Sequence, residues 1–106
     1  MFEVGMIVRV DNAPRDNVTY YSSRYGNMLF HNSEMNRYKG YDFVVKRVLA
    51  SEYKVVLDFL NQYDREKVDS GVSPADTIDS WVWHFDWLTF AEDDVEVDCT
   101  DLGDLL

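Results

Sequence analysis

Short segments rich in β-branched and aromatic residues constrain this chain more than any other feature of its sequence. They span residues 4–10, 41–49, 53–60 and 80–85. Their composition and length are those of β-strands. Asp11–Pro14 supplies turn chemistry after the first segment, and only Ala50–Glu52 separates the second from the third, which predicts an antiparallel hairpin. The sequence therefore predicts a mainly β fold with little helix.

The stretch from 15 to 39 has no clean hydrophobic period. It is rich in Tyr, Asn, Ser and Arg, and it is long for a structureless loop in a small domain. We expect irregular structure here, with one helical turn over residues 33–38. Asn32 or Ser33 would cap that turn and Gly40 would end it.

Two further segments are expected to form loops or helical turns and not strands. Residues 61–79 are polar and contain Gly71 and Pro74, which predicts a second long loop with a helical turn near 64–67. Residues 86–90 are expected to form a tight helical turn that closes the structure. In the strand between them, alternation puts Trp81, Trp83 and Phe85 on one face and Val82 and His84 on the other.

The acidic residues are concentrated at the end of the chain. The 106 residues carry a formal net charge of −10, and the size suits one domain. Residues 1–90 hold 13 acids and 10 bases, a net charge of −3, so we divide the chain into a domain at 1–90 and an acidic extension at 91–106. Within the extension, residues 92–99 alternate acids with Val and Cys, which predicts an edge strand with an acidic outer face.

Charge and cysteine content restrict the class of protein. A strongly acidic chain lacks the Lys/Arg stripes that general binding to nucleic acid or anionic membrane requires. Cys99 is the single cysteine, which excludes an internal disulfide and fits a reducing compartment. No basic start followed by an apolar run, and no apolar stretch of about 20 residues, is present. We therefore expect a cytoplasmic protein.

The residues that catalysis, cofactors or metals would need do not form a recognisable pattern. His31 falls in the polar loop, and His84 alternates with strand aromatics as a packing residue would. The glycines are isolated, so no phosphate-binding loop is present. The run Asp94, Glu96 and Asp98 resembles the start of a calcium loop but lacks its later glycine and glutamate. We expect no enzyme activity, cofactor or metal.

The order of strands and aromatics resembles a known family of folds. It consists of Val4-Gly5-x-x-Val8-x-Val10, then Met35-x-x-Tyr38-x-Gly40-x-x-Phe43-x-Val45-x-x-Val48, then Tyr53-x-Val55, and finally Trp81-x-Trp83-x-x-x-Trp87-Leu88. Over residues 4–90 it resembles the small SH3-like barrel proteins of bacteriophages. The resemblance implies a strongly bent antiparallel barrel with a long first loop, a phage origin, and protein binding through aromatics near that loop. Those would be Tyr20, Tyr21, Tyr25, and Trp81 or Trp83.

The first long loop leaves three interpretations open. Aromatics make up 15% of the chain, more than a core of this size needs, so some rings are expected at a surface. The rings of the loop could pack on the body, or they could bind a protein. They could also stack on nucleic-acid bases while basic neighbours meet phosphates, since Arg15, Arg24, Arg37 and Lys39 lie among them.

The acidic extension also has several interpretations. It could be a solubilising end. It could also be a recognition peptide whose leucines dock in a groove of a partner while its acidic side chains steer it toward that partner. It could also imitate DNA, although carboxylates at alternate strand positions lie roughly 6.7 Å apart and duplex DNA has one charge per about 1.7 Å. The residues considered for partner contact are Glu92, Asp94, Glu96, Asp98, Asp101, Leu105 and Leu106.

Our leading hypothesis is an interaction module that binds and modulates a host or phage protein. The alternatives are a DNA mimic that inhibits a nucleic-acid-binding protein, and direct binding of nucleic acid through the Arg/Tyr loop. A homodimer formed through an edge strand is a further expectation. If the chain is phage-encoded, it would act in the cytoplasm of the bacterial host.

Overall fold

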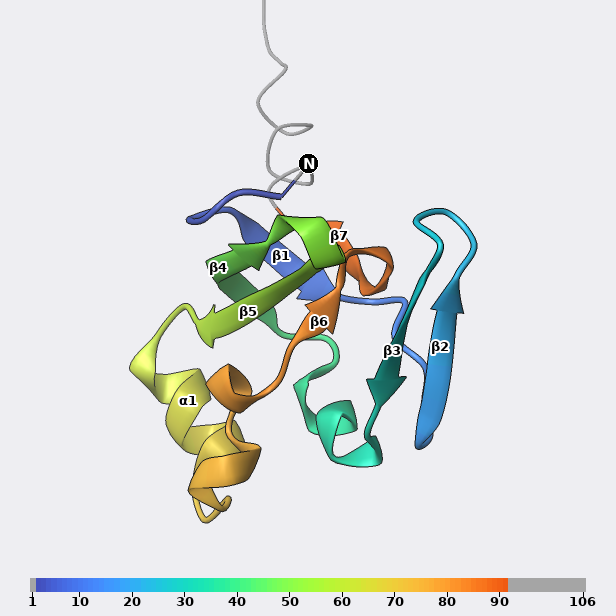
Figure 1. Cartoon of the computed structure of the whole chain (residues 1–106). Coiled ribbons are helices and arrows are strands. Elements are labelled where there is room, and N and C mark those ends of the chain that lie inside the picture. The colour runs from blue at the N-terminus through green and yellow to red at the C-terminus, as the bar shows by residue number, and fades with distance from the viewer. Residues whose placement is uncertain (1, 92–106) are drawn as a thin grey trace, which may run out of the picture.

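The computed structural model describes residues 2–91, and strands are its main secondary structure (Figure 1). Five of them form one antiparallel sheet in the order β6-β5-β4-β1-β7. They are β1 (Ile7–Val10), β4 (Asp42–Leu49), β5 (Lys54–Phe59), β6 (Trp83–His84) and β7 (Leu88–Phe90). The prediction of a mainly β, antiparallel fold is confirmed. Over the described residues the sheet stays open, with β6 and β7 as its outer strands.

The first three strands predicted from the sequence, over residues 4–10, 41–49 and 53–60, are present as β1, β4 and β5. β1 begins three residues later than expected, because Gly5 at φ 96° turns the chain before Ile7. Its alternation is as predicted, with Val8 and Val10 buried. β4 and β5 form the expected hairpin, joined by the 3-10 turn η2 (Ala50–Glu52). Their register shifts between Val45 and Arg47, and such a bulge bends the strand that carries it.

The stretch between β1 and β4 is more regular than the sequence indicated. The expectation of irregular structure is wrong for β2 (Val18–Ser22) and β3 (Asn27–His31), which pair as a separate two-stranded sheet. The helical turn after it is confirmed as the 3-10 helix η1 (Ser33–Tyr38). The Asn32 side chain caps it by accepting a hydrogen bond from the Glu34 backbone N–H at 2.8 Å.

The segment between β5 and β6 contains more helix than the sequence predicted. The region predicted as a loop contains α1 (Gln62–Asp69) and the 3-10 turns η3 (Pro74–Asp76) and η4 (Ile78–Ser80). The strand predicted at 80–85 is reduced to β6, and the turn predicted at 86–90 is the 3-10 turn η5 (Phe85–Trp87) followed by β7. Because β7 pairs with β1, the last described strand lies beside the first. No helix in the described residues is long and apolar enough to cross a bilayer.

Aromatic rings fill much of the core. The largest fully buried side chains include Trp83, Trp87, Tyr38 and Phe43. The Trp83 and Trp87 rings meet edge to face at 6.4 Å, and Tyr38 meets Trp83 at 5.9 Å. Much of the aromatic content is therefore core packing. The edge strand predicted at 92–99 and the remaining residues 100–106 of the acidic extension lie outside the described residues.

Candidate interaction surface

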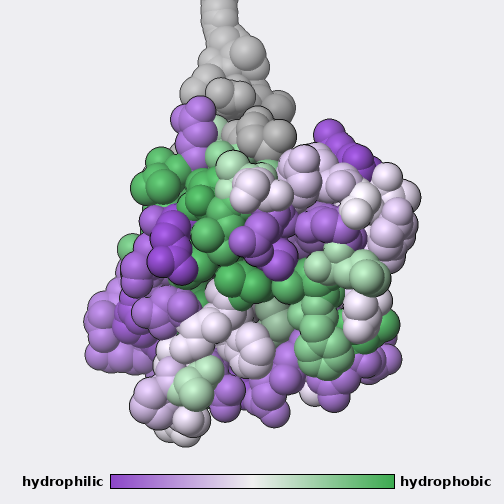
Figure 2. Space-filling model, viewed as in Figure 1, coloured by the Kyte–Doolittle hydropathy of each residue, from purple (hydrophilic) through white to green (hydrophobic). Residues whose placement is uncertain are grey.

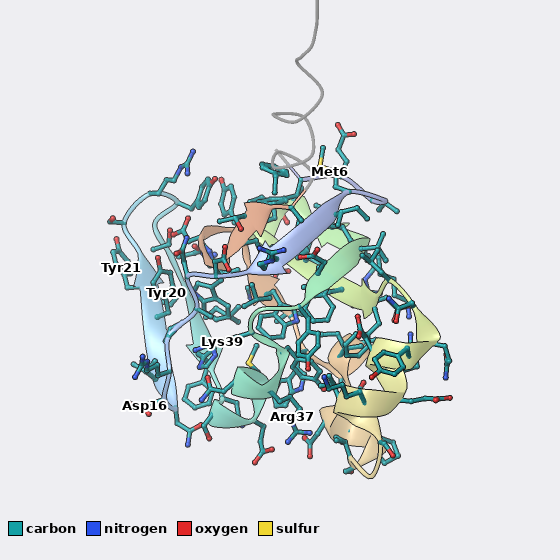
Figure 3. All side chains as sticks on the ribbon, turned by 180° about the vertical axis from the view of Figure 1, so that it is seen from behind. Met6, Asp16, Tyr20, Tyr21, Arg37 and Lys39 are labelled. Carbon is teal, nitrogen blue, oxygen red and sulfur yellow. The ribbon has the colours of Figure 1, made fainter. Side chains whose placement is uncertain are left out.

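The β2–β3 hairpin lies beside the five-stranded sheet and has two different faces. Its register pairs Tyr20 with Leu29 and Tyr21 with Met28. Because successive strand residues point to opposite faces, one face turns toward the body and the other away from it. Figure 3 shows this alternation directly, with Tyr20 directed toward the body and Tyr21 away from it.

A polar network fastens the inner face of the hairpin to the turn η5. The Asp86 carboxylate accepts hydrogen bonds from the Tyr20 hydroxyl at 2.9 Å and from the Ser22 hydroxyl at 2.7 Å. The Ser22 oxygen in turn accepts a bond from the Tyr25 backbone N–H at 3.1 Å. Because hydrogen bonds to an ionised carboxylate are stronger than neutral ones, Asp86 is a strong anchor for β2.

His84 forms the second anchor, and its bonds define its protonation. Its Nδ1 accepts the Asp86 backbone N–H at 3.0 Å, so this nitrogen carries no proton. Its Nε2 lies 2.8 Å from the Asn27 side-chain oxygen and must therefore donate. The Asn27 amide completes the chain by donating to the Glu52 carbonyl at 2.7 Å. Burial lowers the pKa of His84, in agreement with a neutral ring.

His31 lies in a different place from the one predicted. It ends β3 and is fully buried, whereas the sequence placed it in a polar loop. Its Nδ1 is 3.0 Å from the Asp16 carbonyl, and its ring meets Trp87 edge to face at 5.3 Å. Among the described residues its Nε2 has no hydrogen-bond partner. Burial is the main cause that lowers its pKa.

Ser22, His84 and Asp86 resemble the residue types of a catalytic triad, but their geometry differs. In a triad the serine hydroxyl is bonded to the histidine. Here the Ser22 hydroxyl donates to Asp86, and Ser22 is fully buried. The His84 nitrogen that faces Asp86 already accepts a backbone N–H. The three residues therefore hold the hairpin in place and do not form a nucleophile with its base.

Most of the aromatic contact residues predicted from the sequence are used for packing. Tyr25 stacks on Tyr53 at 4.3 Å, and Tyr20 meets Trp87 edge to face at 5.6 Å. Trp83 is fully buried, so its proposed contact with a partner is wrong for the folded chain. Trp81 is half-buried and its indole N–H donates to the Asp76 carbonyl at 3.0 Å. Tyr21 alone of this set is largely exposed.

The outer face of the hairpin is the exposed surface formed by Thr19, Tyr21, Met28 and Phe30. Tyr21 is 60% exposed, Met28 61% and Phe30 51%. Tyr21 lies directly opposite Met28, and Thr19 opposite Phe30, so the side chains form one continuous patch. Figure 2 shows hydrophobic side chains over the part of the molecule where Figure 1 places β3.

Met28 and Phe30 were not predicted as contact residues. The signal that could have found them is the alternation in Asn27–His31, where these two side chains flank Leu29. Leu29 packs against the core, so the residues on either side of it must point away. Because the run is only five residues long and carries polar ends, a loop was the natural expectation.

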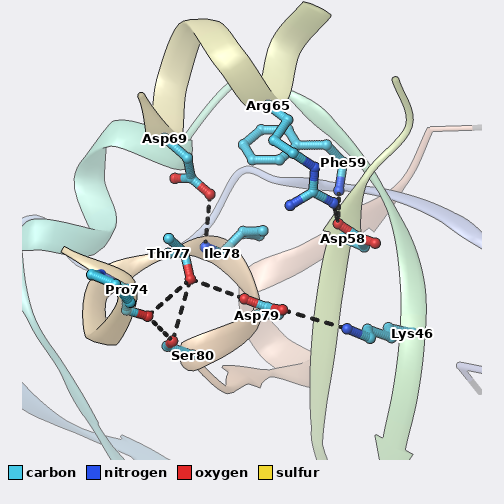
Figure 4. A network of polar contacts seen from close by, with 10 residues as sticks. All are labelled: Lys46, Asp58, Phe59, Arg65, Asp69, Pro74, Thr77, Ile78, Asp79 and Ser80. Carbon is cyan, nitrogen blue, oxygen red and sulfur yellow. Dashed lines mark hydrogen bonds and ion pairs between the residues drawn. The ribbon is translucent and has the colours of Figure 1, made fainter. Parts of the chain in front are cut away.

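A polar groove of about 710 Å³ lies between α1 and the turns η3 and η4. Its lining includes Arg65, Glu66, Asp69, Thr77, Asp79 and Ser80. Figure 4 shows that many of these side chains are bonded to neighbours within the fold. Asp69 accepts the Tyr38 hydroxyl at 2.6 Å and the Ile78 backbone N–H at 3.1 Å.

The remaining charges of the groove are also used internally. Asp79 accepts the Thr77 hydroxyl at 3.0 Å and the Lys46 ammonium at 3.4 Å, and the Thr77 bond is the main cause that lowers its pKa. Arg65 forms an ion pair with Asp58. Burial raises the pKa of the Tyr38 hydroxyl well above its ordinary value, so this group remains a donor and not a base. The groove is a structural junction with few groups left to bind a substrate.

Comparison with known proteins supplies no relative for this chain. A scan against protein-family models found no match, and searches of the curated proteins and of the solved structures found none either.

Proposed function

We propose that this chain is a non-enzymatic protein-interaction module that binds its partner through the outer face of the β2–β3 hairpin. The observation that carries the proposal is the cluster of Tyr21, Met28 and Phe30, each more than half exposed on a paired strand. Contiguous apolar patches on a small protein mark interaction sites more often than isolated apolar residues do.

The residue types of the patch favour a protein as the partner. Tyrosine, phenylalanine and methionine are enriched at protein interfaces, and methionine adapts its shape to the surface it meets. The anchors beneath the patch, Asp86 and His84, hold the strands before binding occurs. A surface that is already ordered loses less entropy on association, which favours affinity.

Direct nucleic-acid binding through the same region has weaker support. Two of its four basic side chains are already engaged, since Arg37 pairs with Glu34 and the Lys39 ammonium donates to the Pro14 carbonyl at 2.5 Å. A DNA-mimic role is also less favoured, because Asp69 and Asp79 near α1 accept internal hydrogen bonds. We therefore favour protein interaction over direct nucleic-acid binding and over a DNA-mimic role.

We also propose that the fold is an SH3-like barrel from a phage genome, with a host or phage protein as the partner. Three features support it: the long connection between β1 and β4, the return of β7 to β1, and the bulge in β4. The hairpin occupies that long connection. The proposed binding face shares Tyr21 with the contacts that the resemblance implies.

The test is affinity capture from bacterial lysate with matched variants of the full chain. The face variant carries Tyr21→Ser and Phe30→Ser. The control variant carries Leu60→Ser and Tyr63→Ser, which remove similar exposed apolar side chains near α1 at 46% and 72% exposure. Wild type and control should enrich the same protein, and the face variant should lose at least about tenfold of it.

Two results would count against the proposal. In the first, wild type enriches nothing beyond bare resin. In the second, the face variant captures the protein as well as wild type, or the control loses it equally. Thermal unfolding of each variant, followed by circular dichroism, verifies that any loss comes from the surface and not from unfolding.

A further inference from the structure

We propose that an aromatic pocket between the turn of the β2–β3 hairpin and β7 binds the leucine-bearing segment 101–106 of the same chain. The pocket is a hollow of about 190 Å³. Its lining consists of Phe2, Arg24, Tyr25, Phe85, Leu88 and Phe90. The inference stands apart from the proposed function, which concerns the outer face of the hairpin.

The aromatic walls of the pocket are held by contacts among their own rings. Phe2 stacks on Phe90 at 4.9 Å and meets Phe85 at 5.0 Å, so the start of the described chain lies against the end of β7. On the side of the hairpin, Tyr25 meets Phe85 edge to face at 5.9 Å and stacks on Tyr53 at 4.3 Å. Because small-molecule sites occupy about 300–1,000 Å³, this hollow suits a single aliphatic side chain better.

One basic side chain borders this apolar hollow. Arg24 is exposed, and its guanidinium lies 5.3 Å from the centre of the Tyr25 ring. Within the described residues it forms no ion pair with an acidic side chain. The ligand that matches the pocket is therefore an aliphatic side chain with a carboxylate beside it.

The position of Phe90 selects the following segment of the same chain as the occupant. Phe90 lines the pocket, and Ala91 is the last residue that the structure describes. Residues 91–106 contain seven acids and no base, and in the segment 101–106, Asp-Leu-Gly-Asp-Leu-Leu, an acid directly precedes a leucine or comes close before one. The chemistry of this segment is thus complementary to an apolar pocket with an arginine at its rim.

Covalent attachment favours this segment over a separate peptide of the same kind. Thirteen residues separate Ala91 from Asp104, and they can span up to about 45 Å, which leaves ample length to return to the pocket. A ligand on a short tether has an effective concentration of about millimolar. One leucine and one charge pair bind weakly, so the tether is what makes occupation of so small a pocket favourable.

The experiment is paramagnetic relaxation in the NMR spectrum of the full chain at low salt, with a nitroxide label at position 103. The labelled parent carries Cys99→Ser and Gly103→Cys, so that the label has one attachment point. The amide signals of Tyr25 and Phe85 should be lost at every protein concentration, because the contact lies within one chain. Spectra without the label verify that each variant is folded.

Two matched variants of the labelled parent identify the side chains that dock. The leucine variant, with Leu102→Ser, Leu105→Ser and Leu106→Ser, should recover both signals. The control with Val95→Ser and Val97→Ser removes aliphatic side chains from the same extension and should leave the signals lost.

A charge reversal tests the contact at the rim of the pocket. Arg24→Glu should recover part of both signals, because it replaces attraction by repulsion. Adding Asp101→Lys and Asp104→Lys should cause their loss again.

The inference is overturned if the labelled parent keeps both signals, or if it loses them only at high concentration, which indicates contact between copies. It is also overturned if the leucine variant loses them as fully as the parent, since the tether alone then accounts for the effect. An unchanged loss in Arg24→Glu would equally contradict the docking described here. None of these results involves Tyr21, Met28 or Phe30, so the proposed function would survive them.

Discussion

The outer face of the β2–β3 hairpin and the groove beside α1 use their side chains in opposite ways. The groove is hollow, but its Asp69 and Asp79 accept hydrogen bonds from Tyr38, Ile78 and Thr77. The apolar side chains of the outer face are more than half exposed and do not belong to the hydrophobic core cluster. The groove has the shape of a binding site, but its carboxylates are already used in hydrogen bonds within the fold. The side chains of the outer face have no such use, and this difference favours the hairpin as the binding surface.

The same comparison explains why polar and apolar residues of the hairpin have different tasks. Tyr20 and Tyr21 are adjacent in sequence, yet Tyr20 donates to Asp86 and Tyr21 lies in solvent. Strand alternation separates them. Substitutions beneath the hairpin or in the groove should therefore affect stability, and substitutions on the outer face should affect binding.

The largest loss of stability is expected from Asp69→Ala in the groove. This change removes two hydrogen bonds to a carboxylate, leaving the Ile78 backbone N–H without that acceptor and the Tyr38 hydroxyl with the Asp76 carbonyl at 2.9 Å, which should reduce the free energy of unfolding by about 3 kcal/mol. Urea unfolding measures it. Asp79→Ala is the matched control, and since Asp79 is exposed we expect a loss of about 1 kcal/mol or less. A loss of about 1 kcal/mol or less for Asp69→Ala as well would show that the groove is not the structural junction described above.

A smaller and more local loss is expected from Asp86→Ala beneath the hairpin. The Tyr20 and Ser22 hydroxyls lose their acceptor, which should cost about 2 kcal/mol. Hydrogen exchange should rise first in residues 18–31, because these bonds join the hairpin to η5. If protection falls evenly through the sheet, the hairpin is not held separately by this network.

Acid should weaken the attachment of the hairpin through His31 and His84. Both have a pKa below the ordinary 6.5 because of burial, so below pH 6.5 the unfolded chain binds more protons than the folded one. The free energy of unfolding should be fully present above pH 6.5 and decline as the pH falls toward the pKa values of the folded state. Urea unfolding at several pH values measures this, and His84→Gln should reduce the slope. An unchanged slope would exclude His84 as a contributor.

The smallest effect on stability is expected from Tyr21→Ser combined with Phe30→Ser. Both rings are more than half exposed, so little buried apolar area is lost, and the free energy of unfolding should change by about 1 kcal/mol or less. The same variant is expected to lose partner binding. A loss of stability as large as that of Asp69→Ala would mean that the outer face is part of the core.

The sequence predicts well the parts of the fold that depend on local pattern. The β4–β5 hairpin follows from β-branched composition and a three-residue connection, and the turn η1 follows from its Asn32 cap. The hairpin of β2 and β3 is less predictable, since its inner face carries Ser22 and Asn27. Ser22 is buried and Asn27 is partly buried, and both depend on partners more than fifty residues away, Asp86 for Ser22 and His84 for Asn27.

The residues of the candidate site likewise divide into those predictable from local sequence pattern and those that depend on distant parts of the fold. Tyr21 was among the predicted contacts, whereas Met28 and Phe30 depend on a strand that the pattern did not reveal. Trp83 was misassigned because an aromatic residue on a short strand has the same local pattern whether it lies in the core or at a surface. Its ring packs against Tyr38 and Trp87 in the core.

The most direct test of the account is photo-crosslinking of the full chain in bacterial cells with p-benzoyl-phenylalanine replacing either Met28 or Glu66. Both positions are exposed, one on the outer face of the hairpin and the other on the lining of the groove. We predict a crosslink to a second, different protein from position 28 and none from position 66. A crosslink from position 66 alone would contradict the claim that the hairpin is the binding surface.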